Sequence, residues 1–197
     1  WHDKASGNCA IDYGFHQIIG GVDDASLRAM DSLVDEGITS FKLFMAYPGV
    51  FYSDDGQILK AMQKSAETGL LTMMHAENGP AIDVLAAQLA EAGKVAPYYH
   101  GIARAWQMEE EATHRAIMLA NLTGAPLYVV HVSAKQAVDQ LAWARDKLLE
   151  YRPASTPVIL ATNLGRDGEH VRTVPLGELN VDDVDMLTVV VVGSSES

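Results

Sequence analysis

The chain has 197 residues, 48% of them hydrophobic and 20% charged, which suits one globular domain, with at most an appendage, and a sizeable core. Its formal net charge of -12 argues against binding to nucleic-acid phosphates, which requires clustered Lys and Arg. No apolar run approaches the roughly 20 residues of a membrane span and no signal peptide opens the sequence, so we expect no membrane partner. The single cysteine, Cys9, lies among apolar residues, which predicts a small buried side chain and a reducing, cytoplasmic location.

Apolar runs alternating with helical patterns predict four strand–helix units before residue 150. The expected strands cover residues 9–16, 40–47, 70–74 and 126–130, and the expected helices cover 24–36, 56–68, 80–92, 109–123 and 134–149. Residues 94–101 break the pattern and predict a surface excursion. Ser53, Asp54 and Asp55 offer caps for the helix at 56–68, which Gly69 is placed to end, and Ser133 is placed to cap the helix that follows it. This alternation implies a parallel sheet with right-handed crossovers.

The pattern changes after residue 153. Strands are expected at residues 156–162, 171–174 and 186–192, and no amphipathic helix of useful length separates them. We therefore expect hairpin or mixed pairing there, and a domain boundary near residues 147–153. Both ends of the sequence have the appearance of cut points inside something larger.

Residues 40–47 place Lys42 inside an apolar run that predicts a buried strand. An unpaired ammonium there would cost several kcal/mol, roughly, in lost hydration. The next two apolar runs end in His75 and His131, so three neighbouring strands could bring these groups to one sheet edge. Imidazole is a common zinc ligand, and a lysine carbamate can bridge two cations, which makes a metal site one interpretation. In the other interpretation both histidines are hydrogen-bonded structural residues and Lys42 reaches for solvent or an acidic neighbour.

Weaker candidates lie outside this group. Asn163 and Gly165 follow an apolar strand and could present backbone groups to a ligand, although a plain turn explains them equally well. His16 and Glu77 could support a site as hydrogen-bonding partners or be ordinary rim residues.

Five segments of the chain resemble the dihydropyrimidinase and D-hydantoinase family, cyclic-amide hydrolases of the amidohydrolase superfamily. The segments are WHDKA at residues 1–5, IDYGFH at 11–16, GITSFKLFMAY at 37–47, HAENG at 75–79 and VHVS at 130–133. The resemblance covers residues 1–147. It implies that Lys42 is carboxylated and bridges two zinc ions, that His75 and His131 are metal ligands, and that Tyr47 stabilises the tetrahedral intermediate.

The resemblance also implies a (β/α)8 barrel, of which this chain would contain strands three to six. The family's His-x-His pair on its first strand and its late aspartate are missing, and the sequence contains no His-x-His anywhere. A hydrolytic zinc site needs an activated water in fixed geometry, which half a ligand set does not provide.

From residue 148 onward the chain resembles a different family, the precorrin methyltransferases of cobalamin biosynthesis. The matching segments are residues 148–166, 174–179 and 185–197. This resemblance implies S-adenosylmethionine binding, for which Asn163 and Gly165 are the only candidates. The change of family within one predicted helix favours a recombined, engineered chimera of segments 1–147 and 148–197, packed into one domain.

The sequence thus predicts an α/β protein with an open, mainly parallel sheet of about six strands, formed by a partial (β/α)8 barrel of four βα units and a methyltransferase-like strand segment. The preferred interpretation is a scaffold without a complete active site and without a cofactor. One alternative is a zinc-dependent cyclic-amide hydrolase completed by a partner chain, and another is residual S-adenosylmethionine binding. Exposed sheet edges predict self-association.

Overall fold

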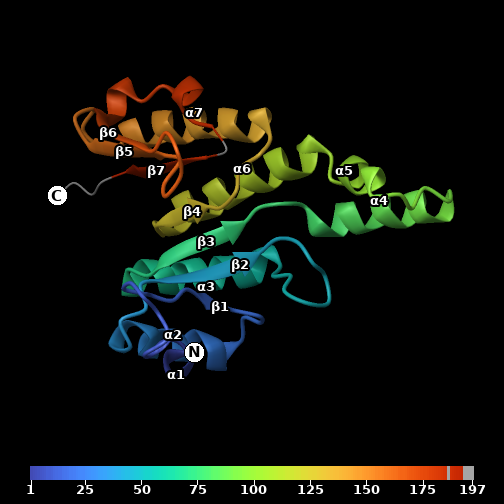
Figure 1. Cartoon of the computed structure of the whole chain (residues 1–197), viewed down its shortest axis with the longest axis horizontal. Coiled ribbons are helices and arrows are strands. Elements are labelled where there is room, and N and C mark those ends of the chain that lie inside the picture. The colour runs from blue at the N-terminus through green and yellow to red at the C-terminus, as the bar shows by residue number, and fades with distance from the viewer. Residues whose placement is uncertain (186, 193–197) are drawn as a thin grey trace. The chain divides into compact units, whose positions relative to one another are not determined.

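The computed structural model describes residues 1–185 and 187–192, and it divides into two compact units. The first unit contains residues 1–75 and 118–130, and the second contains residues 76–117 and the described residues from 131 onward. Figure 1 labels the elements of both units. The predicted boundary near residue 147 stays a prediction.

The first unit is built on a parallel sheet with the strand order β1-β2-β3-β4. Its strands are β1 (Gln17–Ile18), β2 (Ser40–Phe44), β3 (Leu71–His75) and β4 (Leu127–Val129), and its helices are α1 (His2–Ala5), α2 (Asp24–Asp35) and α3 (Asp55–Thr68). The last residues of α6 (Trp106–Thr123) also lie in this unit. The parallel pairing of the second, third and fourth predicted strands is confirmed.

Local sequence signals set the limits of α3. The Asp54 carboxylate accepts a hydrogen bond from the Gln57 backbone N–H at 2.8 Å, and the Gln57 side chain accepts one from the Asp54 N–H at 3.0 Å. This reciprocal capping satisfies two donors at the helix start. Gly69 ends the helix with φ of 77°, a conformation that costs a residue with a Cβ atom more than glycine. Both predicted ends of this helix are confirmed within one residue.

One face of the parallel sheet is fully covered. Phe41, Leu43 and Met74 are completely buried on it, and Thr72 on the same face donates a hydrogen bond to Ser65 of α3 at 3.1 Å. The other face is covered less, since Ile18 on it is 45% exposed. The expectation that β2 is a buried strand is confirmed for four of its five residues, and Lys42 is the half-buried exception.

The second unit contains four helices and an antiparallel sheet with the order β6-β5-β7. Its described elements are α4 (Gly79–Glu91), α5 (Tyr98–Ala103), most of α6, α7 (Lys135–Leu149), β5 (Pro157–Thr162), β6 (His170–Pro175), the 3₁₀ turns η1 (Leu176–Glu178) and η2 (Val181–Asp183), and β7 (Thr188–Val192). The core of this sheet joins Val158 and Leu160 of β5 to Leu176, with Leu148 and Leu149 of α7 packed against it.

The predicted single sheet of about six strands is wrong, because the described strands form separate sheets of four and three strands. The connections explain the difference. Only seven residues lie between β5 and β6, which is too few for the helical crossover that a parallel neighbour requires. The expected hairpin or mixed pairing of these strands is confirmed as antiparallel pairing on both sides of β5. Of the strand expected at residues 186–192, residue 186 lies outside the described part.

Two local expectations are also wrong. Residues 9–16 form no strand, and Ile11 at 83% exposure shows that this segment lacks the covering that a strand face needs. Cys9 is exposed rather than buried. The surface excursion expected at residues 94–101 is confirmed, since nearly all of these residues are exposed, and its last residues belong to α5.

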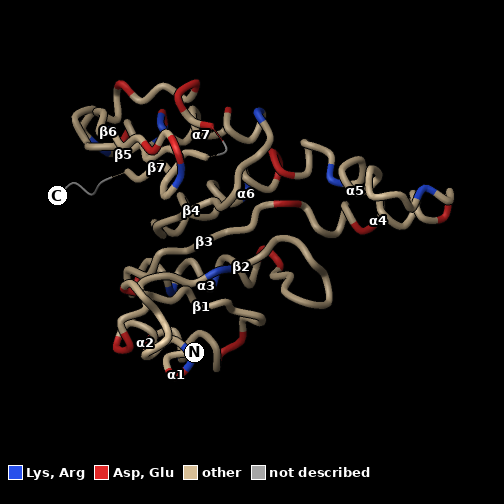
Figure 2. Tube along the Cα trace, in the orientation of Figure 1, with Lys and Arg blue, Asp and Glu red and all other residues tan. Residues whose placement is uncertain are grey.

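No helix within the described residues is both long and apolar enough to span a bilayer. Figure 2 shows Asp and Glu spread along the trace of both units, with fewer Lys and Arg between them, in keeping with the charge of -12.

Candidate functional site

Lys42 lies on the less covered face of the parallel sheet. The register pairs Lys42 with Met73 and Phe44 with His75, and side chains two residues apart on a strand share a face. Lys42, Phe44, Met73 and His75 are therefore on the same side. Because Lys42 is only half-buried there, its ammonium keeps access to water, and the expected desolvation cost does not arise in full.

Aromatic rings lie beside these groups. The Lys42 Nζ atom lies 4.9 Å from the centroid of the Phe44 ring. The Phe44 ring stacks on His75, with centroids 5.6 Å apart, and on Phe51 at 5.1 Å. The Tyr47 ring packs 5.1 Å from His75. We call these five residues the Lys42 cluster. A cation over a ring face is attracted by the ring quadrupole, so Phe44 provides Lys42 with a partner that was not expected from the sequence.

Tyr47 begins the loop after β2 in a conformation that is rare for a residue with a side chain. Its φ is 64°, and its carbonyl oxygen accepts hydrogen bonds from the N–H groups of Val50, Phe51 and Tyr52 at 3.1 to 3.2 Å. These bonds hold the strained backbone in place. The Tyr47 side chain is 38% exposed, while the neighbouring His75 is 6% exposed. Tyr47 therefore presents its side chain to solvent beside a buried imidazole.

His131 lies in the second unit, directly after β4, and is also in the left-handed region, with φ of 43°. Its carbonyl oxygen accepts a hydrogen bond from the Ser133 hydroxyl at 3.1 Å. The expected helix cap at Ser133 is wrong, since α7 has Ala134 at that position and no side chain of its own caps it.

A carboxylate from another helix takes over the capping of α7. Glu109 of α6 accepts hydrogen bonds from the backbone N–H groups of Ser133 and Ala134, the latter at 3.2 Å to both carboxylate oxygens. This places a negative charge at the positive end of α7 and fixes the turn that follows His131. The acidic start of α6 indicated only a favourable helix dipole, so no signal in the sequence pointed to this contact.

Glu77 follows β3 in the chain and forms an ion pair with Arg104, at the end of α5. Both side chains are mostly buried, at 17% and 22% exposure. Asn78 caps α4 by accepting a hydrogen bond from the Ala81 N–H at 3.2 Å, and it donates one to Glu111 at 2.8 Å. All of these contacts lie within the second unit, and Arg104 is thus a structural partner of Glu77.

His16 contacts the buried Ser40 hydroxyl through its Nδ1 atom. Ser40 opens β2, whereas His75 closes β3, and the two strands are parallel. His16 therefore lies at the amino end of the sheet, away from the Lys42 cluster.

The described residues do not form a metal centre by themselves. Among residues 1–185 and 187–192, no group of three or more His, Cys, Asp or Glu side chains is placed to hold a metal ion. In the first unit the implied ligands are Lys42 and His75, which face aromatic rings. A two-metal site of the kind that the resemblance implies does not fit these residues alone.

Asn163 and Gly165 take part in a turn between β5 and β6. Asn163 has φ of 55°, its N–H donates to the Leu187 carbonyl at 3.0 Å, and the Gly165 N–H donates to the Glu169 carboxylate at 2.7 Å. The backbone donors that a ligand would need are thus engaged inside the protein. This arrangement favours the turn interpretation.

A surface hollow among the described residues lies elsewhere. It is open, about 360 Å³ in volume, and lined by residues of α6 and α7: Gln107, Glu110, Glu111, His114, Arg115 and Gln140. It contains none of the predicted site residues.

Comparison with known proteins extends the resemblance described from the motifs. The chain is 65% identical to a D-hydantoinase of Streptomyces coelicolor over 147 residues, which are 75% of this chain and 32% of that protein. A dihydropyrimidinase of Arabidopsis thaliana is 41% identical over 146 residues, 74% of this chain and 27% of the relative. The crystal structure of dihydropyrimidinase from Brevibacillus agri superimposes with a TM-score of 0.72 at 46% identity, over 75% of this chain and 32% of that one.

The N-terminal three quarters of the chain thus resembles D-hydantoinase and dihydropyrimidinase. The chain spans about a third of the length of the curated relatives it matches. No family model matches it. A structure of the methyltransferase CobJ matches with a TM-score of only 0.34 at 14% identity, which is too low to carry an argument. The methyltransferase resemblance and the chimera therefore stay predictions.

Proposed function

We propose that this chain carries one part of a cyclic-amide hydrolase site of the D-hydantoinase and dihydropyrimidinase type, and that it has no complete catalytic apparatus of its own. The observation that supports this proposal is the Lys42 cluster. It combines a half-buried lysine in the middle of β2, a buried imidazole at the carboxyl end of β3 and an exposed tyrosine in the loop after β2, and functional groups of parallel sheets converge at that end.

Within this proposal Tyr47 has the most direct role. Its exposed side chain is anchored by a rigid loop and can donate a hydrogen bond to the oxygen that becomes negative as an amide carbonyl is attacked. His75 is held by Phe44 and Tyr47, so its ring orientation is fixed before any ligand arrives. Zinc is the metal that the family resemblance implies for Lys42, His75 and His131.

The missing groups limit what the chain can do alone. Hydrolysis of a cyclic amide requires a water molecule that is activated by a general base or a metal. Neither the His-x-His pair nor the late aspartate of the family is present in these 197 residues. We therefore propose that a complete site would require these groups from another polypeptide segment.

Hydrolysis of hydantoin and dihydrouracil, measured with zinc-supplemented protein, tests the proposal. We expect no zinc-dependent turnover from the chain alone and well under one zinc per chain by elemental analysis. The variants Lys42→Ala and His75→Ala should behave like the wild type in both measurements. Lys60→Ala, which removes an exposed lysine of α3, is the matched control.

Turnover that requires zinc and is lost in Lys42→Ala, but kept in Lys60→Ala, would refute the claim that the apparatus is incomplete. One zinc per chain that disappears in His75→Ala would show that a metal site persists without the missing ligands. The first result would replace the proposal by that of a working hydrolase, and the second by that of a surviving metal site without proven catalysis.

We also propose that the chain joins two unrelated segments near residue 147. The hydantoinase-like matches cover three quarters of the chain, and the antiparallel sheet of β5, β6 and β7 lies in the remaining quarter. S-adenosylmethionine binding is not proposed, because the turn around Asn163 and Gly165 uses its donors internally.

A further inference from the structure

Strand β7 lies at an edge of the antiparallel sheet and is paired only with β5 among the described strands. Its hydrogen-bonding direction follows from the register. Asn163 N–H bonds to the Leu187 carbonyl, so Thr188 opposite Thr162 is a pair without mutual hydrogen bonds. Because hydrogen-bonded pairs alternate along the strands, the N–H and C=O groups of Val189 and Val191 point toward β5. Those of Val190 and Val192 point outward, away from β5.

The two edges of this sheet differ in how they resist pairing. On β6, Pro175 lacks an N–H group, and Arg172 forms an ion pair with Asp183 at 2.6 Å. Proline and charged residues are the usual means of blocking an edge strand. The described residues of β7 read Thr-Val-Val-Val-Val and contain neither proline nor charge. Among the described residues, the β7 edge is therefore the one that neither proline nor a charged side chain blocks.

We propose that β7 is a self-association edge, through which two copies of this chain pair with antiparallel β7 strands to form one six-stranded sheet. The occupant is a second copy because β7 carries no charge that would face a like charge across a two-fold axis, and because its outward N–H and C=O groups can pair with the same groups of another β7. The blocked β6 edge stops the sheet from adding further copies, so the association closes at a dimer.

A two-fold axis at Val190 gives this pairing a specific register. The outward N–H and C=O groups of Val190 exchange two hydrogen bonds with Val190 of the second copy. The N–H of Val192 in each copy donates to the Thr188 carbonyl of the other copy. The Thr188 N–H is not needed, since it already donates to Asp185 at 3.0 Å. The dimer thus gains four main-chain hydrogen bonds.

Sedimentation velocity on the full chain tests the proposal at increasing protein concentration. The wild type should approach twice its mass of 21.3 kDa. Val190→Pro removes the outward N–H but none that bonds to β5, and it should be monomeric. Val191→Lys places a positive charge on the edge strand. This variant should also be monomeric, because pairing would bring the two lysines of the two copies close together.

Ile159→Lys is the matched control. Ile159 is the register partner of Val191 on β5, and the two are 41% and 49% exposed on the same face. The lysine there adds the same charge away from the edge, so this variant should remain a dimer. Circular dichroism checks that each variant is folded, and Val191→Lys, at an exposed position, keeps the test valid if Val190→Pro unfolds.

A wild type that stays monomeric at the highest concentration would overturn the proposal. So would a dimer that survives Val191→Lys, because a different surface would then join the copies. Growth of the wild type beyond a dimer would refute the closed association.

Discussion

The two sheets of this protein differ in what they carry on the face opposite their fully buried face. On the parallel sheet, Lys42 and His75 lie there beside aromatic rings. On the antiparallel sheet, Ile159, Val171 and Val191 are exposed, with no ionisable side chain among them. Ionisable groups at a sheet edge suit chemistry, whereas an open apolar strand suits association. The proposed small-molecule site and the proposed self-association edge therefore lie on different sheets.

The largest effect that sharpens the comparison concerns the two faces of β2. Phe41→Ala should lower the free energy of unfolding by about 3–5 kcal/mol, because the ring is completely buried and leaves a cavity. Lys42→Ala, one residue along the same strand, should cost about 1 kcal/mol or less, because its side chain is half-buried on the other face. Urea denaturation followed by circular dichroism measures both. Equal losses would mean that both faces are packed alike.

The same contrast should hold within the antiparallel sheet. Leu160→Ala should cost about 2–5 kcal/mol, since Leu160 is 1% exposed and contributes to the core beneath α7. The adjacent Ile159→Ala should cost about 1 kcal/mol or less, because Ile159 is 41% exposed. Both values come from urea denaturation monitored by tryptophan fluorescence, which Trp143 of α7 reports. A large loss in Ile159→Ala would indicate that this face is covered in solution.

A smaller effect concerns the start of α7. Glu109→Ala removes the carboxylate that caps this helix and should cost about 0.5–2 kcal/mol. Ser133→Ala is the control, because the Ser133 hydroxyl donates to the His131 carbonyl and does not cap the helix. Thermal unfolding measures the difference. A greater loss from Ser133→Ala than from Glu109→Ala would restore the sequence-based assignment of the cap.

The features that were predictable from the sequence depend on residues close together in the chain. Helix α3 is an example, because its capping residues Asp54 and Gln57 and its terminating Gly69 are all local. Pairing of β5 with β6 was also foreseen, since a short connection permits only an antiparallel neighbour. The parallel pairing of β2 and β3 places Lys42 and His75 on one face of adjacent strands, while their meeting with His131 in one site stays a prediction.

The features that were missed depend on contacts between distant residues. The Glu109–Ala134 cap joins residues 25 positions apart, and no spacing rule indicates it. The alternation of a strand says that Lys42 and Phe44 share a face, but it cannot say which face the helices cover. Residues 9–16 have a strand-like composition and still form no strand, because nothing covers Ile11 and Tyr13 there. A strand-like composition is not sufficient, because a strand also needs other parts of the fold to pack against it.

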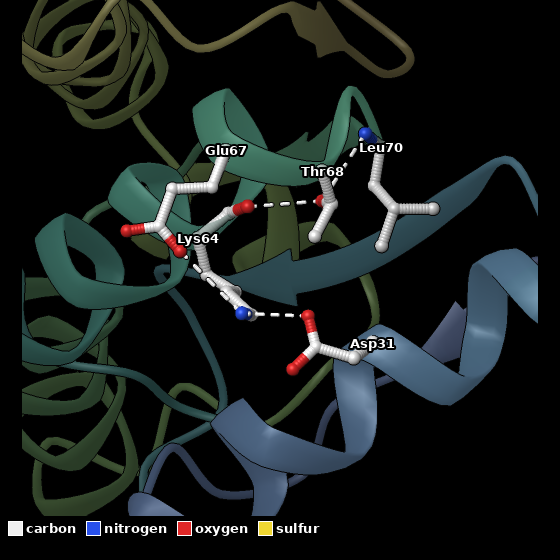
Figure 3. A network of polar contacts seen from close by, with 5 residues as sticks. All are labelled: Asp31, Lys64, Glu67, Thr68 and Leu70. Atoms are coloured by element: carbon white, nitrogen blue, oxygen red, sulfur yellow. Dashed lines mark hydrogen bonds and ion pairs between the residues drawn. The ribbon is translucent and has the colours of Figure 1, made fainter.

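The smallest effect compares the surface ion pairs of the two units. Lys64 of α3 contacts Asp31 of α2 at 2.6 Å and Glu67 at 3.4 Å, and thus joins two helices (Figure 3). Lys147 contacts Glu150 at 2.7 Å, three residues along the same stretch of chain. The hydrogen bond to Asp31 raises the pKa of Lys64 above its usual value, and the bond to Glu150 does the same for the pKa of Lys147.

A raised pKa means that the folded state holds the proton more tightly than the unfolded state. The stabilisation is therefore complete below the unfolded-state pKa of about 10.4 and is lost as the pH rises through the higher pKa of the folded state. The urea midpoint of the wild type should fall when the pH rises from neutral to above the pKa of folded Lys64. In Lys64→Met this fall should be smaller. Lys60→Met, an exposed lysine of the same helix, should leave that fall unchanged. Because the Lys64 pair joins α2 to α3, its removal should alter the alkaline response more than Lys147→Met, whose pair links only neighbouring turns. An equal response in the two variants would show that joining two helices adds nothing to a surface ion pair here.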